Sequence, residues 1–104
     1  MAIKNEIITS SLINVISGSS STSPVSVGIY LCNFSSNQER LNLYVRATGE
    51  AAGNKNTILS NLLMLSGDTF HFPAEKFILS SGDVLSVSGI VGGRVSITTT
   101  YLNI

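Results

Sequence analysis

The chain has 104 residues and a formal net charge of zero, because six Lys or Arg residues balance six Asp or Glu residues. This length corresponds to one domain, which can bury roughly 65% of the surface that the unfolded chain exposes. The basic residues are scattered along the sequence, so no basic stripe is available to neutralise phosphates, and a nucleic-acid partner is not expected. A single cysteine excludes an internal disulfide.

An uncharged stretch runs from residue 7 to residue 38, but Ser, Thr, Asn and Gly interrupt it at almost every step. It is therefore too polar to cross a bilayer, and no membrane partner is expected. Glu6 and the Ser, Thr and Asn content also spoil the apolar segment that a signal peptide would need. Polarity in this chain comes mainly from uncharged groups, which suits strands with one wet face.

Residues 1–26 are expected to form an N-terminal strand or arm and a flexible polar loop, within the same domain as the body formed by residues 27–104. We predict one strand over residues 7–16 and a loop over residues 17–24, which Pro24 closes. The segment has more apolar side chains than one strand needs, so we predict that it packs on a neighbouring chain. The candidate subunit-contact residues are Ile3, Ile7, Ile8, Leu12 and Ile13.

Two strongly alternating segments follow, over residues 25–34 and 40–48. In the second, Leu41, Leu43 and Val45 point to one side of the strand and polar residues point to the other. A surface loop of Gly, Ala and Asn is predicted over residues 49–56. Residues 57–65 also contain leucines at the helical spacing of three to four, but no helix cap or charged face accompanies them, so we predict a strand.

Two similar turns, Ser66-Gly67-Asp68 and Ser81-Gly82-Asp83, each precede a new apolar run. We expect the glycine to take an unusual φ angle and the Asp carboxylate to accept hydrogen bonds from nearby backbone N–H groups. Calcium binding is not predicted, because neither turn has a second acidic residue close by.

The remaining segments complete the pattern. Residues 68–72 form a predicted strand in which His71 faces solvent; Pro73 ends it, Glu75 and Lys76 lie in a solvated turn, and residues 76–79 can form a short strand. Strands over residues 83–90 and 93–104 flank a glycine pair at positions 92 and 93, which is typical of a tight hairpin. Together these periods predict an all-β domain, a single antiparallel β-sandwich of jelly-roll-like type with seven to eight strands.

The sequence offers no constellation for catalysis, no cofactor motif and no metal-ligand set. One His, one Cys and dispersed acids are too few for a metal site, and no G-x-S-x-G nucleophile motif occurs. The triplet Asn33-Phe34-Ser35 matches a glycosylation acceptor, but such triplets arise by chance in chains rich in Asn and Ser. Cys32 is interpreted as a small buried or half-buried apolar residue. We therefore expect that the protein is not an enzyme.

The segments "VGIYLCNFSSNQERLNLYVRA", "ILSNLLMLSGDTFHF", "EKFILSSGDVLSVSG" and "VSITTTYLNI" together resemble small bacteriophage virion proteins. The resemblance covers residues 27–104 and consists of a strand leading into an N-x-S turn, a GDTF corner, a K-x-x-L-x-x-GD corner and a closing strand ending in T-x-Y-x-x-I. It implies a compact β-sandwich and a structural or attachment role, and it carries over no catalytic residue.

The resemblance implies a non-enzymatic structural component of a phage particle, with a capsid decoration (cement) protein as the leading hypothesis. Its expected partners are the major capsid protein or other virion proteins and copies of itself, with a trimer as the working hypothesis. The protein would be made in the host cytoplasm and reside in the virion. The alternative is a tail or fibre module that binds a host glycan or receptor through residues 17–24, 33–39 and 49–56.

Overall fold

The structure is a computed structural model that describes residues 2–21, 24–72, 78–89 and 94–103. Eight strands are present in these residues: β1 (Ala2–Ile8), β2 (Ile13–Ser17), β3 (Pro24–Asn33), β4 (Glu39–Arg46), β5 (Thr57–Met64), β6 (Thr69–Phe72), β7 (Val84–Gly89) and β8 (Val95–Asn103). One 3₁₀ turn, η1 (Asn54–Asn56), lies between β4 and β5. No helix in the described part of the chain has the length and apolar character needed to span a membrane.

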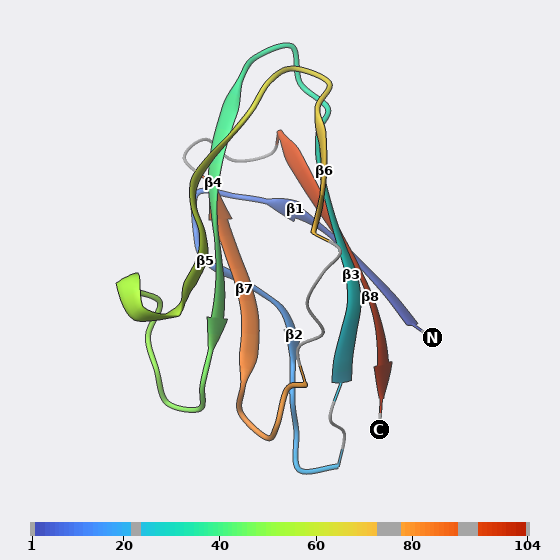
Figure 1. Cartoon of the computed structure of the whole chain (residues 1–104), viewed down its shortest axis with the longest axis vertical. Helices are drawn as coiled ribbons and strands as arrows, with labels where there is room; N and C mark the ends of the chain where they lie inside the picture. Colours follow the sequence, from blue (N-terminus) through green and yellow to red (C-terminus); the bar gives the residue numbers. More distant parts are fainter. Residues whose placement is uncertain (1, 22–23, 73–77, 90–93, 104) are drawn as a thin grey trace.

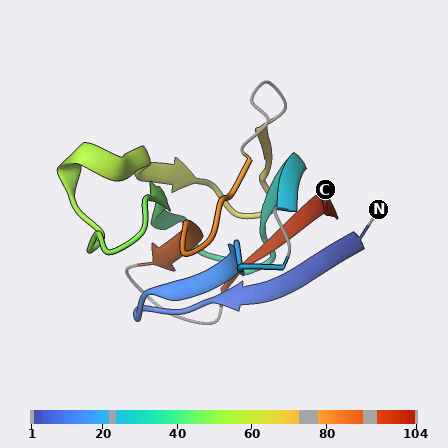
Figure 2. The ribbon, with the colours of Figure 1, turned by 90° about the horizontal axis from the view of Figure 1, so that it is seen from below.

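The strands form two antiparallel sheets of four strands each, in the orders β1-β8-β3-β6 and β2-β7-β4-β5. The two sheets face each other as the layers of a sandwich (Figures 1 and 2). The predicted all-β sandwich is therefore confirmed, and the number of described strands lies within the predicted seven to eight.

The pairing pattern defines the topology. Strand β1 pairs with β8, β2 with β7, β3 with β6 and β4 with β5, and successive pairs alternate between the two sheets. A chain folded back on itself into four antiparallel pairs and then rolled into two layers is a jelly roll. The predicted jelly-roll character is thus present in the strand order.

The core lies between the sheets and follows from the alternation in the sequence. Side chains at every second position of a strand point to the same face, so the apolar series of each strand lines one side. Thirteen apolar residues are buried there: Ile8, Val15, Ile16, Ile29, Leu31, Leu41, Leu43, Met64, Leu79, Leu85, Val87, Val95 and Ile97.

The single strand predicted over residues 7–16 is wrong. The chain forms β1 up to Ile8, crosses over, and begins β2 at Ile13 in the other sheet. A local turn causes the break, because the Thr9 hydroxyl and the Ser11 main chain hydrogen-bond to each other and the Thr9 carbonyl accepts a bond from Gly89 N–H. This crossing explains why the segment has more apolar side chains than one strand needs, because the segment supplies one strand to each of the two sheets.

Residues 57–65 do form a strand, and the helix-like leucine spacing has a local cause. Leu41 pairs with Leu62 and Leu43 pairs with Leu59. An advance of two residues along β4 therefore corresponds to an advance of three residues along β5. The extra residue makes a β-bulge at Asn61, which has a φ of 53°. Because of the bulge, Leu59 and Leu62 both pack against the core although they are three positions apart.

Several predictions for the second half of the chain fall partly or wholly outside the described residues. These are the Gly92-Gly93 hairpin, the turn containing Glu75 and Lys76, and the first half of the short strand over residues 76–79. Within the described part, Ile78 forms an isolated antiparallel bridge with Val25, and Leu79 is buried.

Candidate functional site

The outer face of the sheet β1-β8-β3-β6 is the most distinctive surface of the described residues. Alternation along the strands points Lys4 and Glu6 to the opposite side of β1, so the described side chains on this face include no Asp, Glu, Lys or Arg. We call this surface the uncharged face. Its residues are Ile3, Asn5, Ile7, Gly28, Tyr30, Cys32, Thr69, His71, Ser96, Thr98, Thr100 and Leu102.

Four large apolar side chains are exposed on the uncharged face. Ile3 is 65% exposed and Ile7 46% exposed, and both project from β1. Tyr30 on β3 and Leu102 on β8 are each 42% exposed. A hollow of about 450 Å³ on the β1 and β8 side of this surface is lined by Asn5, Glu6, Ile7, Ser96 and Thr98. The face thus combines exposed apolar surface with uncharged polar groups.

One row of side chains crosses all four strands of this sheet. Asn5, Thr98, Tyr30 and His71 occupy successive partner positions on β1, β8, β3 and β6. The Thr98 hydroxyl donates to Asn5 Oδ1 at 2.7 Å, and the rings of Tyr30 and His71 stack with centroids 4.2 Å apart and an interplanar angle of 3°. The predicted outward orientation of His71 is confirmed, and its described neighbour is an aromatic ring.

The candidate subunit-contact residues separate by exposure into three exposed residues, one half-buried residue and one buried residue. Ile3 and Ile7 lie on the uncharged face, and Leu12, which is 42% exposed, lies in the crossing between β1 and β2. Ile13 is half-buried against the core. Ile8 is 1% exposed and belongs to the core, so the prediction that it is available for a subunit contact is corrected. It points inward because it has the same parity on β1 as Lys4 and Glu6.

The outer face of the other sheet, β2-β7-β4-β5, carries two arginines, Arg40 and Arg46, together with the exposed apolar side chains of Ile58 and Leu63. Arg46 reaches across three strands: its Nε donates to Ser86 Oγ at 2.8 Å, Nη2 to Asn14 Oδ1 at 2.7 Å, and Nη1 to the Glu50 carbonyl at 3.0 Å. It lines a hollow of about 460 Å³ with residues of the 47–56 connection and residues 78, 79 and 83. Because all three nitrogens of the guanidinium already donate, this arginine connects strands.

The carboxylates of the described residues each have a local partner. Asp68 Oδ2 accepts the Leu65 N–H at 2.8 Å, and Asp83 Oδ2 accepts the Ser80 N–H at 3.1 Å. Gly67 and Gly82 have φ angles of 80° and 86°. Both predicted Ser-Gly-Asp turns are therefore confirmed, and they share one hydrogen-bonding pattern.

Three other carboxylates form ion pairs, and the first of these joins Glu6 Oε1 to Lys4 Nζ at 3.4 Å. Glu39 is almost fully buried and its Oε2 lies 3.0 Å from Arg94 Nη1. Glu50 Oε2 lies 2.7 Å from Lys55 Nζ, and this hydrogen bond lowers the pKa of the Glu50 carboxyl from its ordinary value and raises the pKa of Lys55. No group of three or more His, Cys, Asp or Glu side chains placed to hold a metal ion occurs in the part of the chain that the structure describes.

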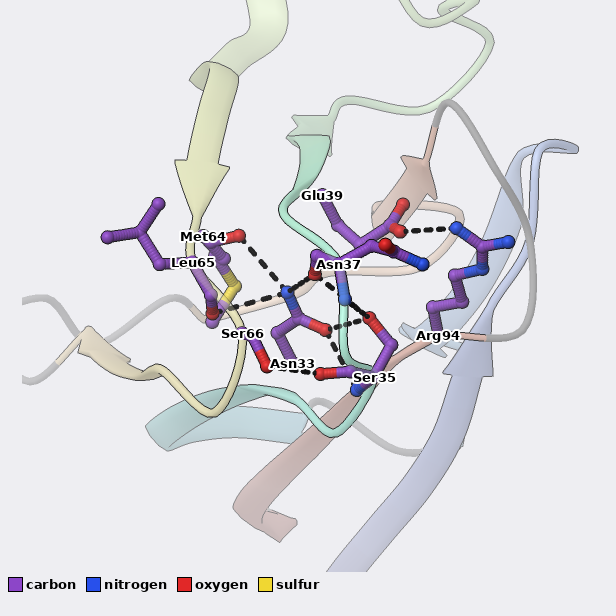
Figure 3. A network of polar contacts seen from close by, with 8 residues as sticks. All are labelled: Asn33, Ser35, Asn37, Glu39, Met64, Leu65, Ser66 and Arg94. Carbon is purple, nitrogen blue, oxygen red and sulfur yellow. Dashed lines mark hydrogen bonds and ion pairs between the residues drawn. The ribbon is translucent and has the colours of Figure 1, made fainter.

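Asn33 is the centre of a polar network at the end of the sandwich where β3 leads to β4 and β5 leads to β6 (Figure 3). Its Nδ2 donates to the carbonyls of Asn37, Met64 and Leu65 at 2.8 to 3.2 Å, and its Oδ1 accepts from the Ser35 N–H and hydroxyl. The Asn33 side chain is 0% exposed. It is a buried connection between two loops, so its amide is not presented as a glycosylation acceptor.

The resemblance to virion proteins pointed to the N-x-S turn. The sequence did not predict that Asn33 connects two loops that are far apart along the chain. The local part of the network, from Ser35 to Asn33, follows from the tendency of Asn to hydrogen-bond backbone groups two residues on. The contacts to Met64 and Leu65 join residues 31 and 32 positions apart, and no short motif signals them. Comparisons with protein-family models, with curated proteins and with solved structures found no match for this chain.

Proposed function

We propose that this chain is a non-enzymatic structural component of a phage particle, of the capsid decoration (cement) kind, that acts through subunit contacts. The observation that supports this most strongly is the uncharged face, with Ile3, Ile7, Tyr30 and Leu102 exposed on it. Interface centres are depleted in charged residues, because burying an unpaired charge costs far more than burying a hydroxyl or an amide. A sheet face that exposes apolar side chains and lacks such charges is suited to contact with another protein.

The jelly-roll topology is compatible with this role, because viral capsid proteins are among the proteins built on it. The same topology also serves lectin domains and cupins, so the fold alone assigns no function. The phage setting therefore rests on the resemblance of residues 27–104 to small virion proteins. The proposed partners are the major capsid protein or other virion proteins and further copies of this chain, in a virion assembled after synthesis in the host cytoplasm.

The alternative, a tail or fibre module that binds a host glycan or receptor through its loops, now has a geometric restriction. Gly18 bridges to Ser81 and the Thr48 hydroxyl donates to the Ser81 carbonyl, so the loops after β2 and β4 share one end of the sandwich. Residues 33–38 lie at the other end (Figure 1). One glycan site could therefore use two of the three loops, and a glycan-array signal lost on shortening residues 49–56 would favour this alternative.

The proposed contact face is tested with a matched pair of leucines. Leu102 on the uncharged face is 42% exposed and Leu63 on the outer face of the other sheet is 40% exposed, so Leu102→Lys and Leu63→Lys place the same charge on opposite faces. The variants are added to particles of the encoding phage that lack this protein, and bound protein is quantified by mass spectrometry. We expect Leu102→Lys to reduce incorporation at least about tenfold, because a lysine would be buried without a partner, and Leu63→Lys to incorporate normally.

Equal incorporation of both variants would contradict the assignment of the face. Absence of the native chain from purified particles would contradict the proposed function itself. Circular dichroism of each variant shows whether the sandwich is retained, so a folding defect is separated from a binding defect.

A further inference from the structure

We propose that two copies of this chain associate through their β1 strands, which pair antiparallel about a two-fold axis at Asn5. The sheet β6-β3-β8-β1 would then continue through the second copy as one eight-stranded sheet. This inference rests on the proposed function for its setting and deepens it, because it names one neighbour of the subunit.

Strand β1 is an edge strand with an unusually regular free side. Among the described strands it pairs with β8 alone, over seven residues and without a register shift. An edge of this kind leaves a row of backbone N–H and C=O groups ready to pair with another strand. Figure 2 shows β1 along the outside of its sheet.

The other three edges have features that hinder such pairing. Strand β6 has four residues, β2 has five residues and a register shift, and β5 is interrupted by the bulge at Asn61. Short edge strands and bulges are the devices by which proteins prevent edge-to-edge association. The contrast singles out β1 as the edge that accepts a partner.

The sequence of β1, AIKNEII, is complementary to itself in the antiparallel direction. With Asn5 opposite Asn5 of the second copy, Lys4 lies opposite Glu6, and Glu6 lies opposite Lys4. On the other side of the strand, Ile3 lies opposite Ile7. Opposite charges and aliphatic pairs at directly facing positions stabilise antiparallel strands, and each such contact occurs twice in an isologous dimer.

This complementarity also selects the register. A slip by two residues would place Lys4 opposite Lys4 in one direction and Glu6 opposite Glu6 in the other. A slip by one residue would place Ile3 opposite Glu6 or Ile7 opposite Lys4. A lysine on an edge strand ordinarily discourages pairing. Here the Lys4 and Glu6 side chains lie 3.4 Å apart within one chain and are 45% and 32% exposed, so both remain accessible to a second copy.

The test is a charge-reversal mixing experiment followed by sedimentation equilibrium at low salt. The variant Lys4→Glu has two glutamates on β1 and Glu6→Lys has two lysines, so each alone would place like charges opposite each other twice. We expect wild-type dimers, each single variant weakened on the order of tenfold or more in dimer Kd, and recovery of dimers when the two variants are mixed. Neither chain regains its internal Lys4–Glu6 pair on mixing, so recovery reports the contact between chains.

The matched control is the ion pair formed by Glu50 and Lys55, whose side chains are 28% and 76% exposed, with Lys55→Glu and Glu50→Lys treated identically. These variants should leave the wild-type dimer Kd unchanged, alone and mixed. A wild-type chain that stays monomeric, a trimer mass, or a mixture that fails to recover dimers would each overturn the proposal, provided that circular dichroism shows folded variants. If the chain is monomeric but still enters particles, the dimer proposal is wrong and the proposed function stands. If the chain dimerises but is absent from particles, the proposed function is wrong and the dimer proposal stands.

Discussion

At the scale of single residues, Thr99 carries a polar group in an apolar place. It lies on the inner side of β8, is 0% exposed, and its hydroxyl has no hydrogen-bond partner in the structure as described. A buried hydroxyl without a partner loses its hydration and gains nothing in return, at a cost of about 1 to 3 kcal/mol. Valine has nearly the same shape and lacks the hydroxyl.

We therefore expect Thr99→Val to raise the free energy of unfolding by about 1 kcal/mol. Urea unfolding at an unchanged m-value measures this. Thr98→Val is the control, because the Thr98 hydroxyl donates to Asn5 and its removal should bring no gain. A Thr99→Val protein less stable than wild type would show that the hydroxyl is satisfied.

The two Ser-Gly-Asp turns provide a second residue-scale prediction, because they share backbone conformation but differ in their surroundings. A Cβ at Gly67 would meet no atom within 4 Å, whereas one at Gly82 would lie 2.6 Å from Thr48 Oγ1. Gly67→Ala should cost about 1 kcal/mol for its positive φ, and Gly82→Ala at least about 1 kcal/mol more. Thermal or urea unfolding measures both.

Thr48→Ala added to each glycine variant tests the cause of the difference. It removes Oγ1 and Cγ2, the two atoms nearest to the new Cβ, and leaves the Thr48 Cβ at 3.1 Å. It should therefore remove most of the excess cost at Gly82 and leave the cost at Gly67 unchanged. An excess cost at Gly82 that is undiminished after Thr48→Ala would contradict this steric explanation.

At the scale of elements, Arg46 joins β4 to β7, β2 and the connection after β4 through three different nitrogens. Lysine has one nitrogen and cannot reproduce this planar fork. We expect Arg46→Lys to lower the free energy of unfolding by about 1 to 2 kcal/mol, because the Ser86 hydroxyl is 0% exposed and would lose its partner. Chemical denaturation provides the measurement.

Arg40→Lys is the matched control for this substitution. Arg40 lies on the same outer face but donates one hydrogen bond, to the Asn61 carbonyl, from an exposed position. Its replacement should change the free energy of unfolding by less than about 0.5 kcal/mol. Similar losses for both variants would mean that the strand connections made by Arg46 contribute little.

Individual elements show what local sequence can and cannot predict. The alternation of Leu41, Leu43 and Val45 and the two Gly-Asp turns depend on neighbouring residues, and both were predictable. The bulge at Asn61 and the crossing after Ile8 were not, because each depends on which strand lies alongside. A bulge converts the period of two into a local spacing of three, which is why residues 57–65 also fitted a helical pattern.

At the scale of the whole molecule, the alternating hydrophobic period predicted a jelly-roll-like sandwich but did not say which strand pairs with which. Pairing β1 with β8 joins opposite ends of the chain, and no local pattern carries that information. The uncharged face likewise depends on strand order and could not be predicted from local patterns. Its outward residues are individually ordinary, and they form one surface only when β1, β8, β3 and β6 lie side by side.

The central claim is that the uncharged face is a contact surface within a phage particle. The most direct measurement is an electron cryomicroscopy map of that particle, resolved well enough to place the eight strands. The account predicts this chain in the map with Tyr30 and Leu102 covered by a neighbouring protein and Arg40 turned toward solvent. A map in which the chain is absent, or in which Tyr30 and Leu102 face solvent, would contradict it.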